Sequence, residues 1–431
     1  MEIDALFPRN DFPLLQREMS GSNRLVYLDS AATAQLPSSV INAIAKHLTQ
    51  HNGAVNRGAH QLAAEATEIC ESARARVANF VGVNPAEIIW TRSTTEAINL
   101  LAYAIGNYTL GRQGRGKAFD FRLSAKDSIV VTRAEHHANL LPWQELCLRT
   151  GAQLRWIDLR SDGTLDLETA DVIDNSTKIL AFAHISNVTG AIAPVAELVA
   201  KAHQHGALVV LDACQSVPHL PVDFRKLDVD FAAFSAHKMF GPAGIGALYG
   251  RFELLDTLPP FQYGGSMIEL VRMEETTYAR VPEKFEAGTQ PVELMAGFAA
   301  AVEYLEKYGM AAVADHEAIL TEYLCAKISQ VPNVRVLGPA TAKEKNKIGV
   351  VAFEVIGVHP HDVGQVLDAQ GIAVRVGHHC AQPVHQHFAV GASSRVSLAP
   401  YNTKADIDAF IIALGKVRAF FGLADSEGKE S

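Results

Sequence analysis

The sequence Phe231-Ala-Ala-Phe-Ser-Ala-His-Lys-Met-Phe-Gly-Pro-Ala-Gly-Ile-Gly246 runs from an apolar strand into Ser235, His237 and Lys238, and a glycine-rich turn follows at once. An amine at the end of a buried strand loses its proton more readily than one in water, because desolvation disfavours the ammonium form. A neutral lysine attacks carbonyl groups and forms Schiff bases. Taken alone, the pattern is more often that of an ordinary lysine at a strand end.

A carboxylate precedes this lysine by one strand–helix–strand unit. Asp212 ends the apolar run Ala207-Leu-Val-Val-Leu-Asp212. Pyridoxal phosphate (PLP) requires such a pair, because a lysine holds its aldehyde and a carboxylate keeps its pyridine nitrogen protonated. An aspartate at this place is also typical of a helix N-cap, so other signals must support a PLP site.

Short apolar runs alternate with helical patterns from residue 24 to residue 250. Several runs are apolar on both faces, as the strands of a covered parallel sheet are. The segments between them, such as residues 195–205, are long enough for helical crossovers. We therefore predict an α/β fold with strands at residues 87–90, 127–132, 152–157, 179–184, 208–211, 231–234 and 245–249.

The C-terminal part has a different pattern. A long helical pattern over residues 293–308 leads out of the α/β region, and the chain beyond it mixes helices with strands such as residues 350–353. The chain ends in a helical run over residues 404–421 and a polar tail. We predict a large domain over residues 24–292 and a smaller α+β domain over residues 293–431, joined by the N-terminal segment 1–23.

One segment within the large domain interrupts the regular pattern. Residues 106–126 are rich in glycine, arginine and lysine. The simplest interpretation is an exposed loop insertion.

Polar residues follow several of the predicted strands, where ligands bind in open α/β sheets. The hydroxyl-rich run Thr91-Arg-Ser-Thr-Thr-Glu96 opens a helical pattern; free N–H groups there suit a phosphate, although a plain capping box looks the same. His136 could stack on a flat cofactor or be structural, and Asn187 and Gln215 could hydrogen-bond a phenolic oxygen. Five strand ends thus direct polar groups toward one crevice.

The second half adds a nucleophile and a carboxylate binder. In Val374-Arg-Val-Gly-His-His-Cys-Ala-Gln-Pro383, a cysteine lies on a turn-like loop beside two histidines. Imidazoles near a loop thiol favour the nucleophilic thiolate, although a buried inert cysteine is the alternative. Arg395 lies on a predicted strand, and its guanidinium fork fits a substrate carboxylate. A zinc site is disfavoured because no carboxylate or second cysteine completes a tetrahedral set with the nearby histidines His378, His379, His385 and His387.

Composition excludes several classes of protein. The chain has 431 residues, 48% of them hydrophobic and 20% charged, which is ordinary for a globular protein. Its net charge of −9 argues against nucleic-acid binding. No apolar run approaches the length of a membrane span, and the acidic N-terminus is unlike a signal peptide, so we expect a cytoplasmic protein. Five scattered cysteines make a disulfide framework improbable.

Seven strings of residues together resemble a known family. The resemblance is to the cysteine desulfurases of the class V aminotransferase group, and in particular to their second subgroup, typified by the SufS and CsdA proteins. It extends over residues 27–422. The strings are Tyr27-Leu-Asp-Ser-Ala-Ala-Thr33, Arg92-Ser-Thr-Thr-Glu-Ala-Ile-Asn99, Glu135-His-His-Ala-Asn-Leu140, Ser186-Asn-Val-Thr-Gly190, Ser235-Ala-His-Lys-Met-Phe-Gly-Pro242, Phe285-Glu-Ala-Gly-Thr289 and Arg375-Val-Gly-His-His-Cys-Ala-Gln-Pro383.

The resemblance implies a PLP-dependent enzyme of fold-type I that works as a homodimer. Lys238 would bind the cofactor covalently and later move protons, His136 would stack on the pyridine ring and Asp212 would pair with its nitrogen. Asn187 and Gln215 would lie near the phenolic oxygen. The phosphate would be held by Thr95, Ser235 and His237, joined by Thr289 of the other subunit.

The resemblance also implies a reaction. L-cysteine would be converted to L-alanine, and the sulfur would remain as a persulfide on Cys380 for transfer to an acceptor protein. Arg395 would bind the substrate carboxylate, with Arg375 near the same loop and Arg57 reaching in from the other subunit. Such enzymes mobilise sulfur for iron–sulfur cluster assembly.

The chain departs from the family pattern at one position before Arg57. Relatives commonly have histidine where this chain has Asn56.

Three alternatives remain open at the level of sequence. A PLP transaminase or lyase of the same fold would use Lys238 and Asp212 but not Cys380. A selenocysteine lyase would share every motif. A sulfur carrier or scaffold would pass on a persulfide with little turnover of its own.

Overall fold

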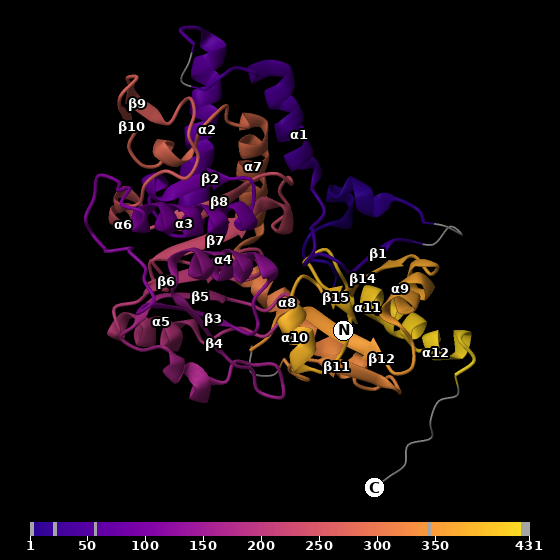
Figure 1. Cartoon of the computed structure of the whole chain (residues 1–431). Coiled ribbons are helices and arrows are strands. Elements are labelled where there is room, and N and C mark those ends of the chain that lie inside the picture. The colour runs from indigo at the N-terminus through magenta and orange to yellow at the C-terminus, as the bar shows by residue number, and fades with distance from the viewer. Residues whose placement is uncertain (1–3, 20–23, 56–57, 343–345, 424–431) are drawn as a thin grey trace.

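The structure is a computed structural model that describes residues 4–19, 24–55, 58–342 and 346–423. It has a large part built on one sheet and a smaller part formed mainly by the C-terminal third of the chain (Figure 1). No helix within these described residues is long and apolar enough to cross a membrane.

The large part contains a mixed seven-stranded sheet. All seven strands predicted from the sequence are confirmed, with bounds that differ by one or two residues. From β7 to the β4 edge neighbouring strands run parallel, whereas β8 runs antiparallel to both of its neighbours. The strand order is β2 (Ile88–Thr91), β8 (Gly246–Gly250), β7 (Phe231–Ser235), β6 (Leu208–Asp212), β5 (Thr177–Ala183), β3 (Ser128–Thr132) and β4 (Gln153–Ile157).

Helices cover both faces of this sheet, as the apolar runs predicted. Successive residues of one strand belong to different cores: Val209 and Leu211 pack on one side, Leu208 and Val210 on the other. Side chains alternate along a strand, so a strand that is apolar throughout needs cover on both sides. One face is covered by α2 (Gln61–Phe80), α5 (Val195–Gln204) and α7 (Val292–Tyr308), the other by α3 (Thr94–Thr109), α4 (Leu141–Thr150) and α6 (Phe252–Thr257). Helix α1 (Ser38–Lys46) packs on α7.

The smaller part has the predicted α+β character. Its antiparallel sheet has the order β11 (Val334–Leu337), β12 (Val350–Val355), β15 (Ser393–Ser397) and β14 (Arg375–Gly377). The helices of this part are α8 (Met310–Ile328), α9 (Pro360–Asp368), α10 (Gln382–His387), α11 (Lys404–Leu414) and α12 (Val417–Phe420). The short strand β1 (Val26–Tyr27) pairs in parallel with β13 (Ile372–Ala373), so the beginning of the chain also contributes to this core. The division into domains at residues 24–292 and 293–431 stays a prediction.

The segment 106–126 is more than the exposed insertion expected from its composition. Helix α3 continues to Thr109, and Phe121 and Leu123 are buried in the core beside it. The backbone N–H of Arg115 donates to Asp256 O, which ties the loop to the end of α6. Two apolar side chains in a polar, glycine-rich stretch are a weak signal, which is why the composition alone suggested a loop.

A hairpin projects from the large part (Figure 1). It consists of β9 (Ile268–Val271) and β10 (Thr276–Tyr278). Leu270, Val271 and Met273 are all exposed, and Met273 exposes 97% of its surface. Exposed apolar side chains at this density are typical of an interaction surface.

Candidate active site

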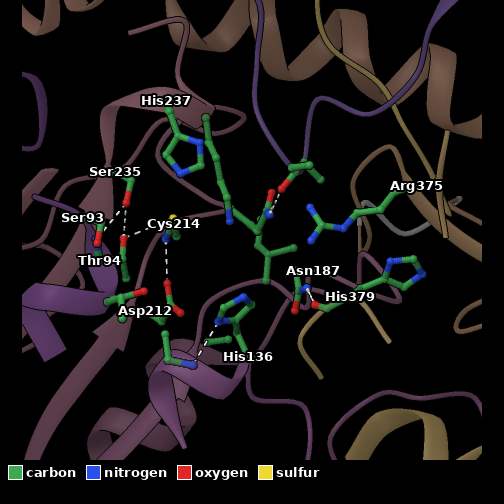
Figure 2. Close-up of a pocket in the computed structure, with 18 of the residues that line it drawn as sticks. Ser93, Thr94, His136, Asn187, Asp212, Cys214, Ser235, His237, Arg375 and His379 are labelled. Atoms are coloured by element: carbon green, nitrogen blue, oxygen red, sulfur yellow. Dashed lines mark hydrogen bonds between the residues drawn. The ribbon is translucent and has the colours of Figure 1, made fainter. Parts of the chain in front are cut away.

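The predicted crevice exists as a cavity of about 240 Å³ at the carboxyl ends of the strands. Figure 2 shows Ser93, Thr94 and Ser235 on one side of it and Asn187, Arg375 and His379 on the opposite side. The cavity therefore lies between the large sheet and strands β14 and β15 of the smaller part. Its lining includes ten residues predicted from the sequence: Thr95, His136, Asn187, Asp212, Gln215, Ser235, His237, Lys238, Arg375 and Arg395.

A candidate anion-binding site lies where β2 leads into α3. The N–H of Thr94, the first residue of α3, donates to Ser235 Oγ at 2.8 Å, and the two hydroxyl oxygens lie 2.8 Å apart. The Thr94 hydroxyl also donates to Cys214 Sγ at 3.2 Å. Hydroxyls at the positive end of a helix dipole suit a phosphate. This part of the cavity fits the phosphate of the predicted cofactor.

Lys238 and Asp212 both face the cavity. Lys238 ends a single 3₁₀ turn directly after β7, and its side chain is half-buried. Asp212 is the last residue of β6, and burial raises the pKa of its carboxyl, while the charge of Lys238 opposes this shift. Asp212 Oδ1 accepts the backbone N–H of Cys214 at 3.0 Å. A buried carboxyl with a lysine in the same cavity fits the nitrogen and aldehyde ends of PLP.

His136 forms another wall of the cavity. Its Nδ1 accepts the N–H of Ala138 at 3.0 Å. Burial lowers the pKa of His136 to about 3, and the charge of Lys238 acts in the same direction. The ring is therefore neutral and carries its proton on Nε2. A neutral ring can stack on a flat aromatic cofactor at no cost in desolvated charge.

A buried carboxyl holds the loop that carries His136. Glu135 accepts hydrogen bonds from the Thr132 hydroxyl at 2.5 Å, from Asn139 Nδ2 at 2.6 Å and from the Ala183 N–H at 3.1 Å. Burial raises the pKa of Glu135 to about 8. These bonds join the ends of β3 and β5, so they fix the direction in which His136 leaves the sheet.

The two amides predicted for the phenolic oxygen are oriented by backbone carbonyls. Asn187 Nδ2 donates to His379 O at 2.7 Å, and Gln215 Nε2 donates to Ala31 O at 2.9 Å. Each NH₂ group keeps a second proton. Gln215 Oε1 is buried and has no hydrogen-bond partner within the described part of the chain. A buried polar atom without a partner at a cavity wall indicates a ligand or water there.

Arg395, on β15, lines the cavity from the side of the smaller part and is 1% exposed. Its NH1 group donates to Asn187 O at 3.0 Å, and its NH2 group donates to Asp29 Oδ1 at 3.1 Å. Burial lowers the pKa of Arg395 to about 10, with Asp29 opposing the shift. The guanidinium has five N–H donors, so these contacts orient it without using up its capacity to bind a carboxylate.

Cys380 opens onto a second cavity, of about 450 Å³. Thr95, His136 and Ala138 line both cavities and so form the wall between them. Cys380 is half-buried, whereas the other four cysteines are buried. The most accessible thiol of the chain thus lies directly beside the lysine-containing cavity.

One predicted site residue lies elsewhere: Thr289 lines two other cavities and not the one with Lys238. Arg57, which was also predicted, is outside the described residues. Four polar residues of the cavity lining had no individually predicted role: Ser93, Thr94, Cys214 and His379. Ser93 and Thr94 belong to the hydroxyl-rich run at the start of α3, so their helix N-terminal position was a usable signal. Asp29 was also missed, because its contact with Arg395 spans 366 residues of sequence.

Comparisons with known proteins identify the family of the chain. A family model described as aminotransferase class-V matches residues 26–410. The chain is 51% identical to the "Probable cysteine desulfurase 2" of Mycobacterium leprae over 97% of this chain and 98% of that one. The apo structure of a cysteine desulfurase from Thermococcus onnurineus is similar with a TM-score of 0.85 and 36% identity, over 94% of this chain and 98% of that chain. The Escherichia coli cysteine desulfurase CsdA, in an S-sulfonic acid form, is similar with a TM-score of 0.84 and 35% identity, over 96% and 98%.

Proposed function

Because this chain belongs to the class-V aminotransferase family, we propose that it is a PLP-dependent cysteine desulfurase. It converts L-cysteine to L-alanine and retains the sulfur as a persulfide on Cys380. The observation that carries the proposal is the position of Cys380 in the cavity next to the one that holds Lys238, Asp212 and Arg395, with Thr95, His136 and Ala138 lining both. A transaminase, or a lyase that does not act on cysteine or selenocysteine, would have no use for a thiol at that place.

The cavity lining indicates which residues would hold PLP. Lys238 would bind the aldehyde, Asp212 would pair with the pyridine nitrogen and His136 would stack on the ring. Bound PLP supplies an electron sink for bonds to the substrate's Cα. Asn187 and Gln215 would offer their remaining N–H groups to the phenolic oxygen. The phosphate would be held by Thr95, Ser235 and His237 at the N-terminus of α3.

The protein's own residues bind the substrate and move its protons. The Arg395 fork binds the substrate carboxylate, with Arg375 beside it, and Lys238 Nζ takes the proton from Cα. Cys380 Sγ attacks the substrate sulfur: an S–S bond forms, the substrate's Cβ–S bond breaks, and a proton replaces sulfur on that carbon. The net change is one thiol and L-cysteine to one persulfide and L-alanine. Because the thiol is already positioned, the attack benefits from a high effective concentration.

The proposal extends to a homodimer with shared sites. Thr289 is exposed and lies away from the Lys238 cavity of its own subunit, so it is available to another copy. The β9–β10 hairpin also exposes Leu270, Val271 and Met273, an apolar surface suited to a second copy. Arg57 is proposed to act in the same shared site. We further propose a cytoplasmic location and a protein sulfur acceptor.

One experiment tests the function. The purified protein loaded with PLP is incubated with L-cysteine, and alanine, sulfide and the mass of the Cys380 peptide are measured. We expect alanine well in excess of one equivalent per subunit, in an amount equal to the L-cysteine consumed, and the addition of one sulfur to that peptide. Pyruvate or a new amino acid in place of alanine would indicate a lyase or transaminase. Alanine limited to one equivalent until an acceptor protein is added would indicate a carrier with little turnover of its own.

A further inference from the structure

The backbone at the proposed nucleophile has an unusual conformation. His379 (φ 52°) and Cys380 (φ 56°) are consecutive non-glycine residues in the left-handed region. A side chain makes this region unfavourable, so the loop keeps its shape only where other contacts hold it. Two bonds act on the backbone itself: Asn187 Nδ2 donates to His379 O, and the N–H of His137 donates to Cys380 O, both at 2.7 Å.

A third set of contacts converges on one buried hydroxyl. Ser393 is the first residue of β15 and is fully buried. Its Oγ lies 2.9 Å from His379 Nε2 and 2.9 Å from His385 Nε2. The other nitrogen of His385, Nδ1, lies 3.1 Å from Ala381 O. Ser393 is therefore linked to the residue before Cys380 directly, and to the residue after it through His385.

The protons in this chain of bonds can be assigned. A carbonyl only accepts, so His385 Nδ1 carries a proton and donates to Ala381. Burial lowers the pKa of His385, so the ring is neutral and its Nε2 accepts the Ser393 hydroxyl proton. Ser393 Oγ can then accept from His379 Nε2, because burial lowers the pKa of His379 to about 2 and that ring is neutral too. Each group thus donates to the next: His379 to Ser393, Ser393 to His385, and His385 to the carbonyl of Ala381.

We propose that Ser393 is a positioning residue for Cys380: its hydroxyl, through His379 and His385, holds the left-handed loop that keeps the thiol in the cavity next to the Lys238 site. Ser393 does not line the Lys238 cavity, so it acts without touching substrate or cofactor. The use of the thiol rests on the function proposed above, whereas the ordering of the loop does not. Without the hydroxyl, two buried imidazoles lose their shared partner and the strained loop loses contacts on both sides of Cys380.

The test compares Ser393→Ala with Ser394→Ala in the PLP-loaded protein. Ser394 is equally buried, but its hydroxyl contacts only Pro360 O, at 3.5 Å, among the hydrogen bonds of the described residues. We expect Ser393→Ala to speed hydrogen exchange of the Ala381 and His137 amides by about tenfold or more. Alanine formation from L-cysteine should fall by a similar factor, with PLP absorbance and L-cysteine affinity unchanged. Ser394→Ala should behave as wild type. Ser393→Thr, which keeps the hydroxyl, should retain the wild-type amide exchange and the wild-type rate of alanine formation.

A second variant guards against a failure of Ser393→Ala to fold. His385→Asn keeps a short amide near Ala381 O, but that side chain cannot reach Ser393. It should therefore also speed hydrogen exchange of the Ala381 amide. Iodoacetamide labelling of Cys380, the only one of the five cysteines that is not buried, should become faster in both variants. The proposal is overturned if Ser393→Ala and His385→Asn match Ser394→Ala in exchange and labelling. If the wild type makes no alanine, the proposed function fails, while exchange and labelling still decide the role of Ser393.

Discussion

The buried Arg395 and the half-buried Asp29 form an ion pair at the edge of the cavity, with 3.1 Å between Arg395 NH2 and Asp29 Oδ1. Burial raises the pKa of Asp29, and Arg395 opposes that shift. The pair sets both the direction of the guanidinium and the net charge that a substrate carboxylate meets. These two effects are separable by substitution.

We predict that Asp29→Asn tightens binding of a carboxylate ligand. The amide oxygen can still accept from Arg395, but the competing negative charge is gone, so the site is more positive by one unit. We expect about a 3–10-fold lower Kd for L-alanine, measured by titration calorimetry. Asp29→Ala, which removes the orienting acceptor as well, should bind more weakly than Asp29→Asn. If both variants weaken binding equally, charge is not the determinant.

Cys380→Ser should separate the desulfurase from the other PLP enzymes. The substitution removes the nucleophile but leaves Lys238, Asp212 and Arg395 in place. The variant should bind PLP and show spectral changes with L-cysteine, yet make little alanine. Selenocysteine should be processed better than cysteine, because selenium leaves more readily. Alanine formation at the wild-type rate would refute the role of Cys380.

Mixing two inactive variants tests the shared site. Lys238→Ala should lose the visible absorption of the lysine-bound cofactor and all turnover. Thr289→Ala should weaken the phosphate site of the partner subunit. Under subunit exchange the mixture should regain activity, because some dimers contain one intact site. A monomer in light scattering at micromolar concentration would contradict the composite site.

The segment that carries Thr289 is anchored by a buried ion pair. Arg74 donates to both carboxylate oxygens of Glu286 at 2.7 and 2.9 Å, and Glu286 also accepts the Trp90 N–H. Arg74→Ala leaves a buried carboxylate without its cation, so we expect a loss of about 3–5 kcal/mol in the free energy of unfolding. Urea denaturation measures this loss.

Arg76, on the same helix α2 as Arg74, provides a control with an exposed ion pair. Arg76 pairs with Glu306 at 2.8 Å, and both side chains are 41% exposed. Arg76→Ala should cost less than about 1 kcal/mol, since solvent screens exposed pairs. Equal losses in the two variants would show that burial does not make the Arg74–Glu286 pair more costly to break than an exposed pair.

Acid should destabilise the cofactor-free protein through its buried histidines. Burial lowers the pKa of His184 and of His237 to about 4 each, below the ordinary value of 6.5. Between pH 6.5 and 4 the unfolded chain binds protons that these folded rings do not, so stability falls as pH falls, by up to about 1.4 kcal/mol per pH unit for each ring. Glu135 works in the opposite direction, because its pKa is raised to about 8.

The contribution of one ring can be isolated. His184 does not line the Lys238 cavity. His184→Gln should therefore lower the dependence of the unfolding free energy on pH between pH 6 and 4.5. The decrease should be up to about 1.4 kcal/mol per pH unit, which corresponds to one proton, and urea titrations at several pH values measure it. A slope equal to that of the wild type would mean that His184 is protonated in the folded state.

Much of the fold and site could be read from local sequence. The seven strands of the large sheet were identifiable because a strand covered on both sides must be apolar along its whole length. Polar residues directly after such strands reach the same edge of the sheet, and this placed Lys238, Asp212, His136 and Asn187 around one cavity. These are properties of residues close together in the chain.

Contacts between distant segments were decided only by the tertiary structure. The Asp29–Arg395 pair, the wall that separates Cys380 from the Lys238 cavity, and the placement of Ser393 between His379 and His385 depend on how the two parts of the molecule pack. A hydrogen bond is set by distances of about 3 Å and by angles. Residue spacing along the chain does not determine such distances once a loop or a second sheet lies between the partners.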